Sequence, residues 1–322
     1  MDAIEAQGEL ESFIDQALHR GICIQERVEE RRGGGEDGNN VTDEVAVRIR
    51  GVSHQFGEQG GTRYVRALLD TSLDIRRGEL LCLIGPSGCG KSTLLNIMGG
   101  LMEPAAGTVE VGNQRVRGPM PQEIAFVFQE NALFPWSTVI ENVKLGMMFQ
   151  GVRKAKRESR AKLSLEAVGL MDFADYYPSQ LSGGMRQRAA LARALSLETG
   201  ILLMDEPFGA LDEQTRMVLG EDLSVLLSRT DKTIVFVTHS LGEAVFLADR
   251  VAVFSARPGT IKEIIEVDEP HPRKPDFITS EKFTRIRNRL YSLLHDEIRK
   301  AVSQSAVSER VAADESSREA KP

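Results

Sequence analysis

Short apolar runs alternate with longer helical patterns through the middle of the chain. The runs at 80–84, 123–128, 200–204, 232–238 and 250–255 have strand length and are almost continuously hydrophobic. Strands that are apolar on both faces are typical of a parallel sheet covered by helices on both sides. Before them, VAVRIRGVSHQF alternates like a strand from Val45 onwards. The pattern therefore predicts an α/β domain over about 45–265.

A purely helical pattern interrupts this alternation between about 135 and 180. Thr138–Glu141 reads TVIE, which matches a capping box at the start of a helix. The charged, amphipathic stretch Lys154–Val168 predicts a second helix. The sequence thus indicates a helical subdomain inserted into the α/β core.

Both ends of the chain lie outside this domain. In 1–44, apolar residues at helical spacing predict an amphipathic helix, followed by the flexible linker RRGGGEDGNN. This extension is either a dispensable leader or a helix that docks on a partner. In 266–322, the spacing of apolar residues over 283–298 predicts one more helix, which packs on its own core or on a second copy. The polar tail from about Ser303 is expected to be disordered.

Composition narrows the function classes. The net charge of −7 and the pI near 5.5 argue against a broad nucleic-acid surface, which needs a basic face. The 3 cysteines, at 23, 82 and 89, show neither a metal-binding spacing nor a disulfide framework, which favours a reducing compartment. No apolar run approaches the roughly 18–20 residues that a membrane-spanning helix needs. If the protein works at a membrane, we expect it to act from outside the bilayer.

The segment GPSGCGKST matches the phosphate-loop pattern GxxxxGK[ST] between a predicted strand and a predicted helix. Glycines allow backbone N–H groups to wrap phosphates, and the helix N-terminus adds partial positive charge. Lys91 supplies a cation to the phosphates, and the Ser92 hydroxyl is a ligand for Mg²⁺. The predicted nucleotide-binding residues here are Gly85, Pro86, Ser87, Gly88, Cys89, Gly90, Lys91, Ser92 and Thr93.

Two adjacent carboxylates end the apolar run ILLMDE. Taken alone, such a pair is usually a solvated turn. Beside a phosphate loop, Asp205 can hold Mg²⁺ through water, which leaves Glu206 free to orient and deprotonate the attacking water. A further helix start lies at LSGGM, where Ser182, Gly183 and Gly184 precede a strong helix former. Taken alone, this is either an ordinary cap or a second phosphate contact.

Taken together, the motifs resemble those of the ABC (ATP-binding cassette) ATPases. The phosphate loop, FVFQE, LSGGM, the acidic pair, GALD and the histidine after TIVFVTH follow that family's order. Met185 departs from the glutamine that most members have. The resemblance implies a phosphate-loop ABC ATPase core with an antiparallel β part and an inserted helical subdomain. It also implies that two copies, or one copy and a paralogue, enclose two ATP molecules head to tail.

The resemblance also implies roles for individual residues. Phe56 resembles the aromatic residue that stacks on adenine, and Gln129 resembles the residue that senses Mg²⁺ and links to the membrane partner. His239 resembles the switch histidine at the γ-phosphate, and Asp212 resembles an acid at the dimer interface. The resulting set is catalytic Glu206, His239 and Gln129; Mg²⁺ ligands Ser92, Gln129 and Asp205; and ATP contacts from the phosphate loop, Phe56, Ser182, Gly183, Gly184 and Asp212.

A finer resemblance concerns the type of ABC protein. FVFQENALFPWSTVIENVKLG and Ser255–Gly259 (SARPG) are similar to the nitrate, sulfonate and taurine group of bacterial importers, although bicarbonate, cyanate and thiamine-precursor importers look alike. This similarity implies permease partners, an indirect periplasmic binding protein and a place on the cytoplasmic face of the inner membrane. Leu133, Phe134 and Trp136 are either core of the insertion or a docking surface for a permease helix. The alternative is a non-transport ABC ATPase of translation or DNA repair.

Overall fold

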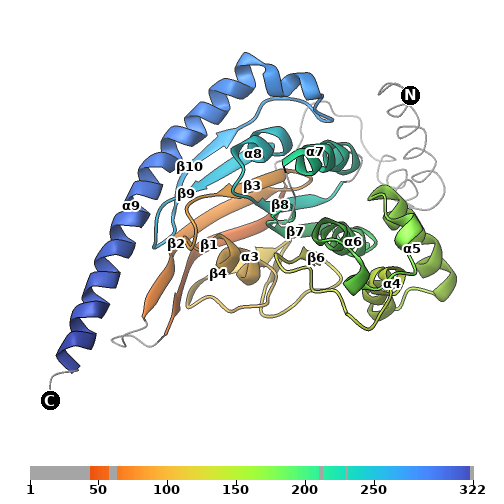
Figure 1. The fold of residues 1–322 in the computed structure, drawn as a ribbon, viewed down its shortest axis with the longest axis horizontal. Coiled ribbons are helices and arrows are strands. Elements are labelled where there is room, and N and C mark those ends of the chain that lie inside the picture. The colour runs from red at the N-terminus through yellow and green to blue at the C-terminus, as the bar shows by residue number, and fades with distance from the viewer. Residues whose placement is uncertain (1–43, 58–63, 210–212, 229–230, 320–322) are drawn as a thin grey trace. The chain divides into compact units, whose positions relative to one another are not determined.

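The computed structural model describes residues 44–57, 64–209, 213–228 and 231–319 (Figure 1). The chain divides into two compact units. The sheet unit contains Val45–Met120, Ile201–Glu206 and Glu213–Pro322, and the helical unit contains Pro121–Gly200 and Pro207–Asp212. The expected N-terminal helix and linker, as well as Asp212, lie outside the described residues.

A mainly parallel sheet forms the core of the sheet unit. Its strands run in the order β10-β9-β3-β8-β7, and only β10 is antiparallel to its neighbour. Every residue of the four parallel strands is buried. These strands confirm the prediction from apolar runs. Their bounds are β3 Leu80–Ile84, β7 Ile201–Asp205, β8 Thr233–Val237, β9 Arg250–Phe254 and β10 Ile261–Glu266.

An antiparallel sheet completes this unit, as the fold resemblance implies. Its strand order is β2-β1-β4-β5. Strand β1 alternates between buried and more exposed residues through much of its length, as expected for a strand with one face on the core. The strands are β1 Val45–Phe56, β2 Val65–Arg76, β4 Ala106–Val111 and β5 Gln114–Arg115.

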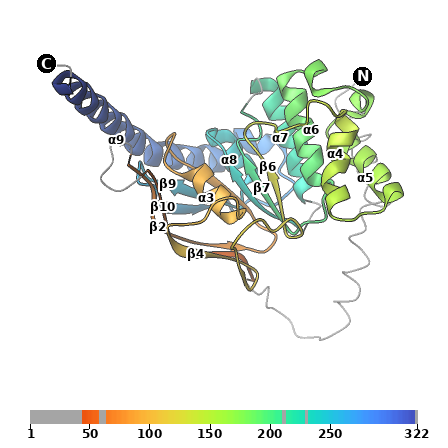
Figure 2. The same ribbon diagram turned by 90° about the horizontal axis from the view of Figure 1, so that it is seen from below.

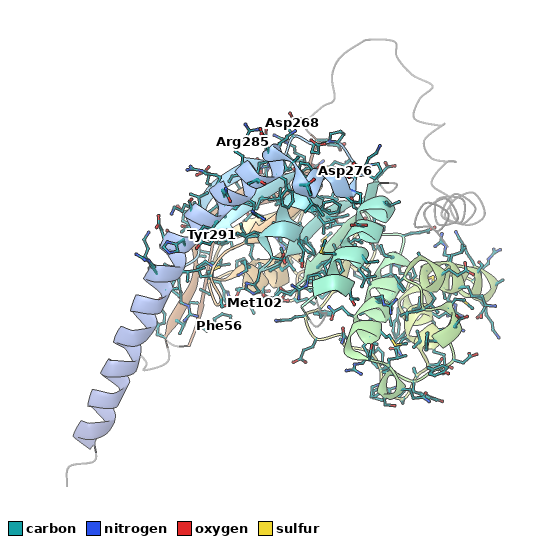
Figure 3. All side chains as sticks on the ribbon, turned by 45° about the horizontal axis from the view of Figure 1, so that its top comes forward. Phe56, Met102, Asp268, Asp276, Arg285 and Tyr291 are labelled. Atoms are coloured by element: carbon teal, nitrogen blue, oxygen red, sulfur yellow. The ribbon has the colours of Figure 1, made fainter. Side chains whose placement is uncertain are left out.

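Helices of the sheet unit are α3 Lys91–Met98, α7 Glu213–Ser228, α8 Leu241–Leu247, the short η3 Pro275–Thr279 and α9 Glu281–Glu319. The last of them, α9, runs beside β9 and β10 in two perpendicular views (Figure 1, Figure 2). It packs on α8, β9 and η3 through Phe283, Leu290, Leu293 and Leu294, which are buried. The helix therefore packs on its own unit. Tyr291, labelled in Figure 3, directly follows the buried Leu290 and is 60% exposed.

The C-terminal tail differs from the prediction. We expected a disordered segment from about Ser303, but α9 continues to Glu319. The reason lies in composition, since alanine, glutamate and arginine are good helix formers and extend a helix that already has a packed nucleus. Within the described ranges, no helix is both long and apolar enough to cross a membrane.

The helical unit begins with the short strand β6 Ile124–Val127 and is otherwise built from helices. Thr138 caps the first helix: the Glu141 N–H donates to Thr138 Oγ1, and the Thr138 N–H donates to Glu141 Oε2. This reciprocal pair confirms the predicted capping box. The helices are α4 Val139–Phe149, α5 Lys154–Ala167, η1 Met171–Phe173, η2 Pro178–Gln180 and α6 Gly183–Leu195.

Candidate functional site

Neighbouring parallel strands of the sheet unit bring the candidate residues to one edge. The segment Gly85–Gly90 joins β3 to α3, Asp205 and Glu206 lie at the end of β7, and His239 follows β8. Because β7, β8 and β3 are mutually parallel, their carboxyl ends meet at the same edge. Ligands of open α/β sheets bind at this edge.

The backbone of the phosphate loop requires glycine at Gly90. This residue has φ +104°, and an added Cβ would lie 2.7 Å from Leu68 Cδ2 and 2.8 Å from the Ala67 carbonyl oxygen. Gly90 also precedes α3, and no side chain of the described residues caps this helix. Its first N–H groups therefore face no competing acceptor from a cap and suit an external anion.

Lys91 begins α3 and is only 4% exposed. Its Nζ donates to the carbonyl oxygens of Gly85 and Pro86, at 2.9 and 3.0 Å. The loop thus folds around its own cation. Cys89 Sγ lies 3.7 Å from this ammonium, yet burial raises the pKa of the thiol above its usual range, so Cys89 remains a neutral packing residue.

Ser92 and Asp205 form the second part of the site. Ser92 Oγ donates to Asp205 Oδ1 at 3.0 Å. Burial raises the pKa of Asp205 above its usual range, the nearby Glu206 charge adds to this, and the Ser92 hydrogen bond only partly opposes it. A buried carboxylate of this kind is stabilised by a cation.

These two oxygens fit Mg²⁺, which prefers oxygen ligands and usually keeps several waters. Within the described ranges, no cluster of three or more His, Cys, Asp or Glu side chains is placed to hold a metal. Mg²⁺ held by one carboxylate, a hydroxyl and nucleotide phosphates needs no such cluster. Gln129, the other predicted ligand, is exposed in the bend after β6 of the helical unit.

Glu206 and His239 are brought together directly. His239 Nε2 lies 2.6 Å from Glu206 Oε1. Glu206 has φ +48°, a left-handed conformation that is uncommon outside glycine, asparagine and aspartate, and its N–H donates to the Val237 carbonyl at 3.0 Å. Strained backbone of this kind concentrates at functional sites, because the surrounding structure must maintain it. The structure thus pairs two residues that are 33 positions apart in the sequence.

Phe56 lies at the end of β1 and is 43% exposed (Figure 3). The ring of His54 meets it edge to face, with 4.9 Å between the centroids. This contact covers part of an aromatic ring that is otherwise partly exposed to solvent. The exposure is consistent with a stacking platform for a base.

In the helical unit, Ser182 is the N-cap of α6, and its Oγ accepts a hydrogen bond from the Met185 N–H at 3.2 Å. Gly183 and Gly184 form the first turn of the helix. The ordinary cap that the sequence allowed is therefore present. The cap uses the Met185 N–H, and the two residues before Met185 are glycines, which carry no side chain.

Two residues at the phosphate loop were not predicted from the sequence. Arg257 Nε donates to the Gly88 carbonyl at 3.0 Å, and Gly259 packs against Cys89 so closely that a Cβ would lie 1.9 Å from its carbonyl oxygen. Both belong to the SARPG run, whose only signal in the sequence is its similarity to the importer group. The separation of 169 residues between Arg257 and Gly88 leaves no local signal for the contact.

Comparisons with known proteins agree with this geometry. Residues 68–209 match the family model described as ABC transporter. The nitrate import ATP-binding protein NrtD of Synechocystis is 47% identical over 206 residues, which cover 64% of this chain and 77% of NrtD. The aliphatic sulfonates import ATP-binding protein SsuB of Bacillus cereus is 41% identical over 246 residues, which cover 76% of this chain and 94% of SsuB.

A solved structure of an ATP-binding cassette, a dimer in a post-hydrolysis state bound to ADP and Pi, matches with a TM-score of 0.63 and 33% identity, covering 70% of this chain and all of that one. The chain therefore belongs to the ABC transporter family, and it is an ATP-hydrolysing subunit of that family.

Proposed function

We propose that ATP binds at the Gly85–Thr93 loop and that Glu206 is the general base of its hydrolysis. The observation that carries this proposal is the meeting, at one sheet edge, of an uncapped helix start, a buried lysine, a serine–carboxylate pair and a glutamate held by a histidine. The adenine would stack on Phe56, which offers an open aromatic face.

Each side chain then has a distinct task. Lys91 exchanges its loop carbonyl partners for phosphate oxygens, and Ser92 with Asp205 and Gln129 would hold Mg²⁺, which neutralises charge on the phosphates. Glu206 accepts the proton of the attacking water. His239 holds the Glu206 carboxylate in place and would exchange that contact for the γ-phosphate when ATP binds. Ser182, Gly183 and Gly184 of a second copy complete the site from the opposite side, and Asp212 would lie at that interface.

We further propose that the chain powers import of a small anion. The relatives named for nitrate and aliphatic sulfonates support this class of cargo, but the cargo does not contact the ATPase and its identity rests on kinship. Transmembrane permease subunits would be direct partners, and a periplasmic binding protein would act through them. The subunit would lie on the cytoplasmic face of the membrane.

The segment Leu133–Trp136 favours permease docking over the alternative of a buried core. Trp136 is 73% exposed, and its ring centroid lies 5.4 Å from that of Phe134. Beneath these rings, the Asn142 side chain accepts from the Phe134 N–H at 2.7 Å and donates to the Phe134 carbonyl at 3.1 Å. A fixed backbone that presents exposed aromatic rings is typical of an interface anchor.

Co-purification tests the importer function. Membranes from cells that co-express the chain with a candidate permease should retain the wild-type chain. They should retain Trp136→Glu at least tenfold less, because the substitution places a charge in an apolar contact. Phe149→Glu is a matched control: it places the same charge on another exposed aromatic residue of the helical unit, 77% exposed, outside the Leu133–Trp136 segment. Equal loss for both variants contradicts the assigned surface. Co-purification with ribosomes or DNA instead supports the non-transport alternative.

A further inference from the structure

The loop after β9 contacts the phosphate loop through a charged side chain. Besides the 3.0 Å hydrogen bond from Arg257 Nε to the Gly88 carbonyl, a Cβ placed on Gly88 would lie 2.5 Å from Arg257 Nη2. The guanidinium therefore lies directly against Gly88. Arg257 itself is exposed, so packing does not account for its position, and the hydrogen bond is what holds it.

The same loop contacts its surroundings at Gly259. The Gly259 N–H donates to the Ala67 carbonyl at 2.8 Å, and its carbonyl accepts from the Leu69 N–H at 3.1 Å. Within the loop, Ser255 Oγ donates to the Pro258 carbonyl at 3.1 Å and accepts from the Thr260 N–H at 3.0 Å. These contacts give the segment a defined conformation, from which Arg257 extends over the phosphate loop.

Helix α9 holds the other side of this loop. Glu297 is 2% exposed and accepts from the Ala256 N–H at 2.8 Å. Its other oxygen accepts from Lys262 Nζ at 2.9 Å and Lys300 Nζ at 2.8 Å. Burial alone would raise the pKa of Glu297, but these hydrogen bonds outweigh it and lower the pKa to about 2, so the carboxylate stays charged.

We propose that Arg257 is a positioning residue of the ATP site and that Glu297 of α9 holds it in place through Ala256. A chain of contacts runs from the helix to the loop in the order Glu297, Ala256, Arg257, Gly88. Fixing the Gly88 carbonyl from one side pre-orders the loop, which lowers the entropy that nucleotide binding must otherwise supply. The C-terminal helix is thus a structural part of the nucleotide site. This inference rests on the proposed binding of ATP to the Gly85–Thr93 loop.

The test measures nucleotide affinity of the full chain. In isothermal titration calorimetry with Mg²⁺ and ADP, Arg257→Ala should raise the Kd about three- to tenfold, the range of one ordinary solvent-exposed hydrogen bond. Arg257→Lys keeps a donor and should recover part of the loss. In ATPase assays the KM for ATP should rise by a similar factor, while kcat at saturating ATP stays within about twofold, since only binding is affected.

Glu297→Ala should raise the ADP Kd in the same direction. If Glu297→Ala fails to fold, Arg257→Ala decides the question, because Arg257 is exposed and its loss should leave the unfolding temperature without nucleotide unchanged. The matched control is Arg289→Ala, which removes another α9 ion pair, to Glu263 of β10 at 2.8 Å, without touching the 255–259 loop. This control should bind ADP as the wild type does.

The proposal is overturned if Arg257→Ala binds ADP with wild-type affinity, or if Arg289→Ala weakens binding equally. Lys91→Ala separates this result from the assignment of the site. If Lys91→Ala leaves the ADP Kd unchanged, nucleotide does not bind at this loop and the proposed function fails first. If Lys91→Ala abolishes binding while Arg257→Ala has no effect, only the positioning role is wrong.

Discussion

Two helix N-termini with glycines in front of them, or in their first turn, are the proposed phosphate contacts of this chain, and they differ in how their backbone N–H groups are satisfied. Helix α3 follows the left-handed Gly90, has no side-chain cap among the described residues and begins with the buried Lys91. Helix α6 follows Ser182, whose hydroxyl caps the first turn. The first end has open donors and a cation of its own, whereas the second has no cation and one of its donors, the Met185 N–H, is already used by the Ser182 cap.

This difference indicates a division of labour. An uncapped helix start with an internal lysine binds an anion without help from a second chain. A capped start without a cation contributes donors only where another surface has already fixed the phosphate. We therefore expect the sheet unit to bind nucleotide alone and the helical unit to act only when two copies assemble.

The largest expected effect comes from the carboxylate beside α3. If α6 contributes only backbone and hydroxyl donors, all proton transfer depends on the sheet unit. Glu206→Gln should then lower the rate of ATP hydrolysis by about 10²-fold or more while ATP binding persists. The measurements are phosphate release and size-exclusion chromatography, in which the variant should form an ATP-bound dimer. His239→Ala should slow hydrolysis with nearly unchanged affinity. Hydrolysis near the wild-type rate in Glu206→Gln contradicts the assignment.

A pair of glycine substitutions compares the two helix ends directly. Gly90→Ala forces an alanine into φ +104° and against the Ala67 carbonyl, which costs about 1–3 kcal/mol and should weaken ADP binding about tenfold or more. Gly183 is the first residue of α6 and does not have a positive φ, so Gly183→Ala introduces no comparable backbone strain. Titration of each variant with ADP measures the loss of affinity that we expect for Gly90→Ala and not for Gly183→Ala.

ATP-dependent dimer formation is the second measurement for this pair. In the Glu206→Gln background, Gly183→Ala should bind ADP normally but form less ATP-dependent dimer, because its methyl group would approach the phosphates of the other copy. Normal ADP affinity in Gly90→Ala, or reduced ADP affinity in Gly183→Ala, contradicts the proposed difference between α3 and α6.

The sequence predicts the buried parallel strands well and the edge strands poorly. Strands β3 and β8 are apolar on both faces, so the run itself reveals them. Strand β10 reads IKEIIE and alternates, and its pairing with β9 depends on tertiary context that the sequence does not show. Strand β2 also lies outside the apolar runs, and Gly78, at φ +76°, separates it from the buried β3.

A similar limit applies to the site. The phosphate loop was predictable because its glycines, lysine and serine are contiguous, and the strand-end carboxylates follow from parallel topology. The pairing of His239 with Glu206 and that of Arg257 with Gly88 arise only when distant segments fold together. The predicted roles of Gln129, Phe56 and Asp212 remain predictions for binding experiments.

A smaller effect is expected on the free energy of unfolding when the cap of α6 is removed. Ser182→Ala removes the acceptor for the Met185 N–H and should lower the free energy of unfolding by about 1 kcal/mol. Ser182→Asn keeps a good cap and should restore stability. Urea denaturation measures both. If the serine hydroxyl also meets the nucleotide of the second copy, ATP-dependent dimer formation should remain weak in Ser182→Asn. Full recovery of the dimer would leave Ser182 with a capping role alone.

The smallest expected effect is a gain in stability, and it comes from replacing Asp205. Burial raises the pKa of Asp205, so the charged carboxylate costs stability in the folded chain at pH 7 without Mg²⁺. Asp205→Asn should therefore raise the unfolding temperature of the metal-free protein, by a few degrees at most, since 1 kcal/mol corresponds to roughly 2–4 °C at this size. The gain should shrink as the pH falls through the raised pKa, because the wild-type carboxyl is then protonated and the cost of burying its charge disappears.

With Mg²⁺ and ATP present, the wild type should be more stable than Asp205→Asn, because the wild type is stabilised by the bound ligand and the variant is not. Thermal melts with and without Mg²⁺ and ATP measure both signs. A variant that is less stable without the metal would show that Asp205 holds the fold rather than the cation.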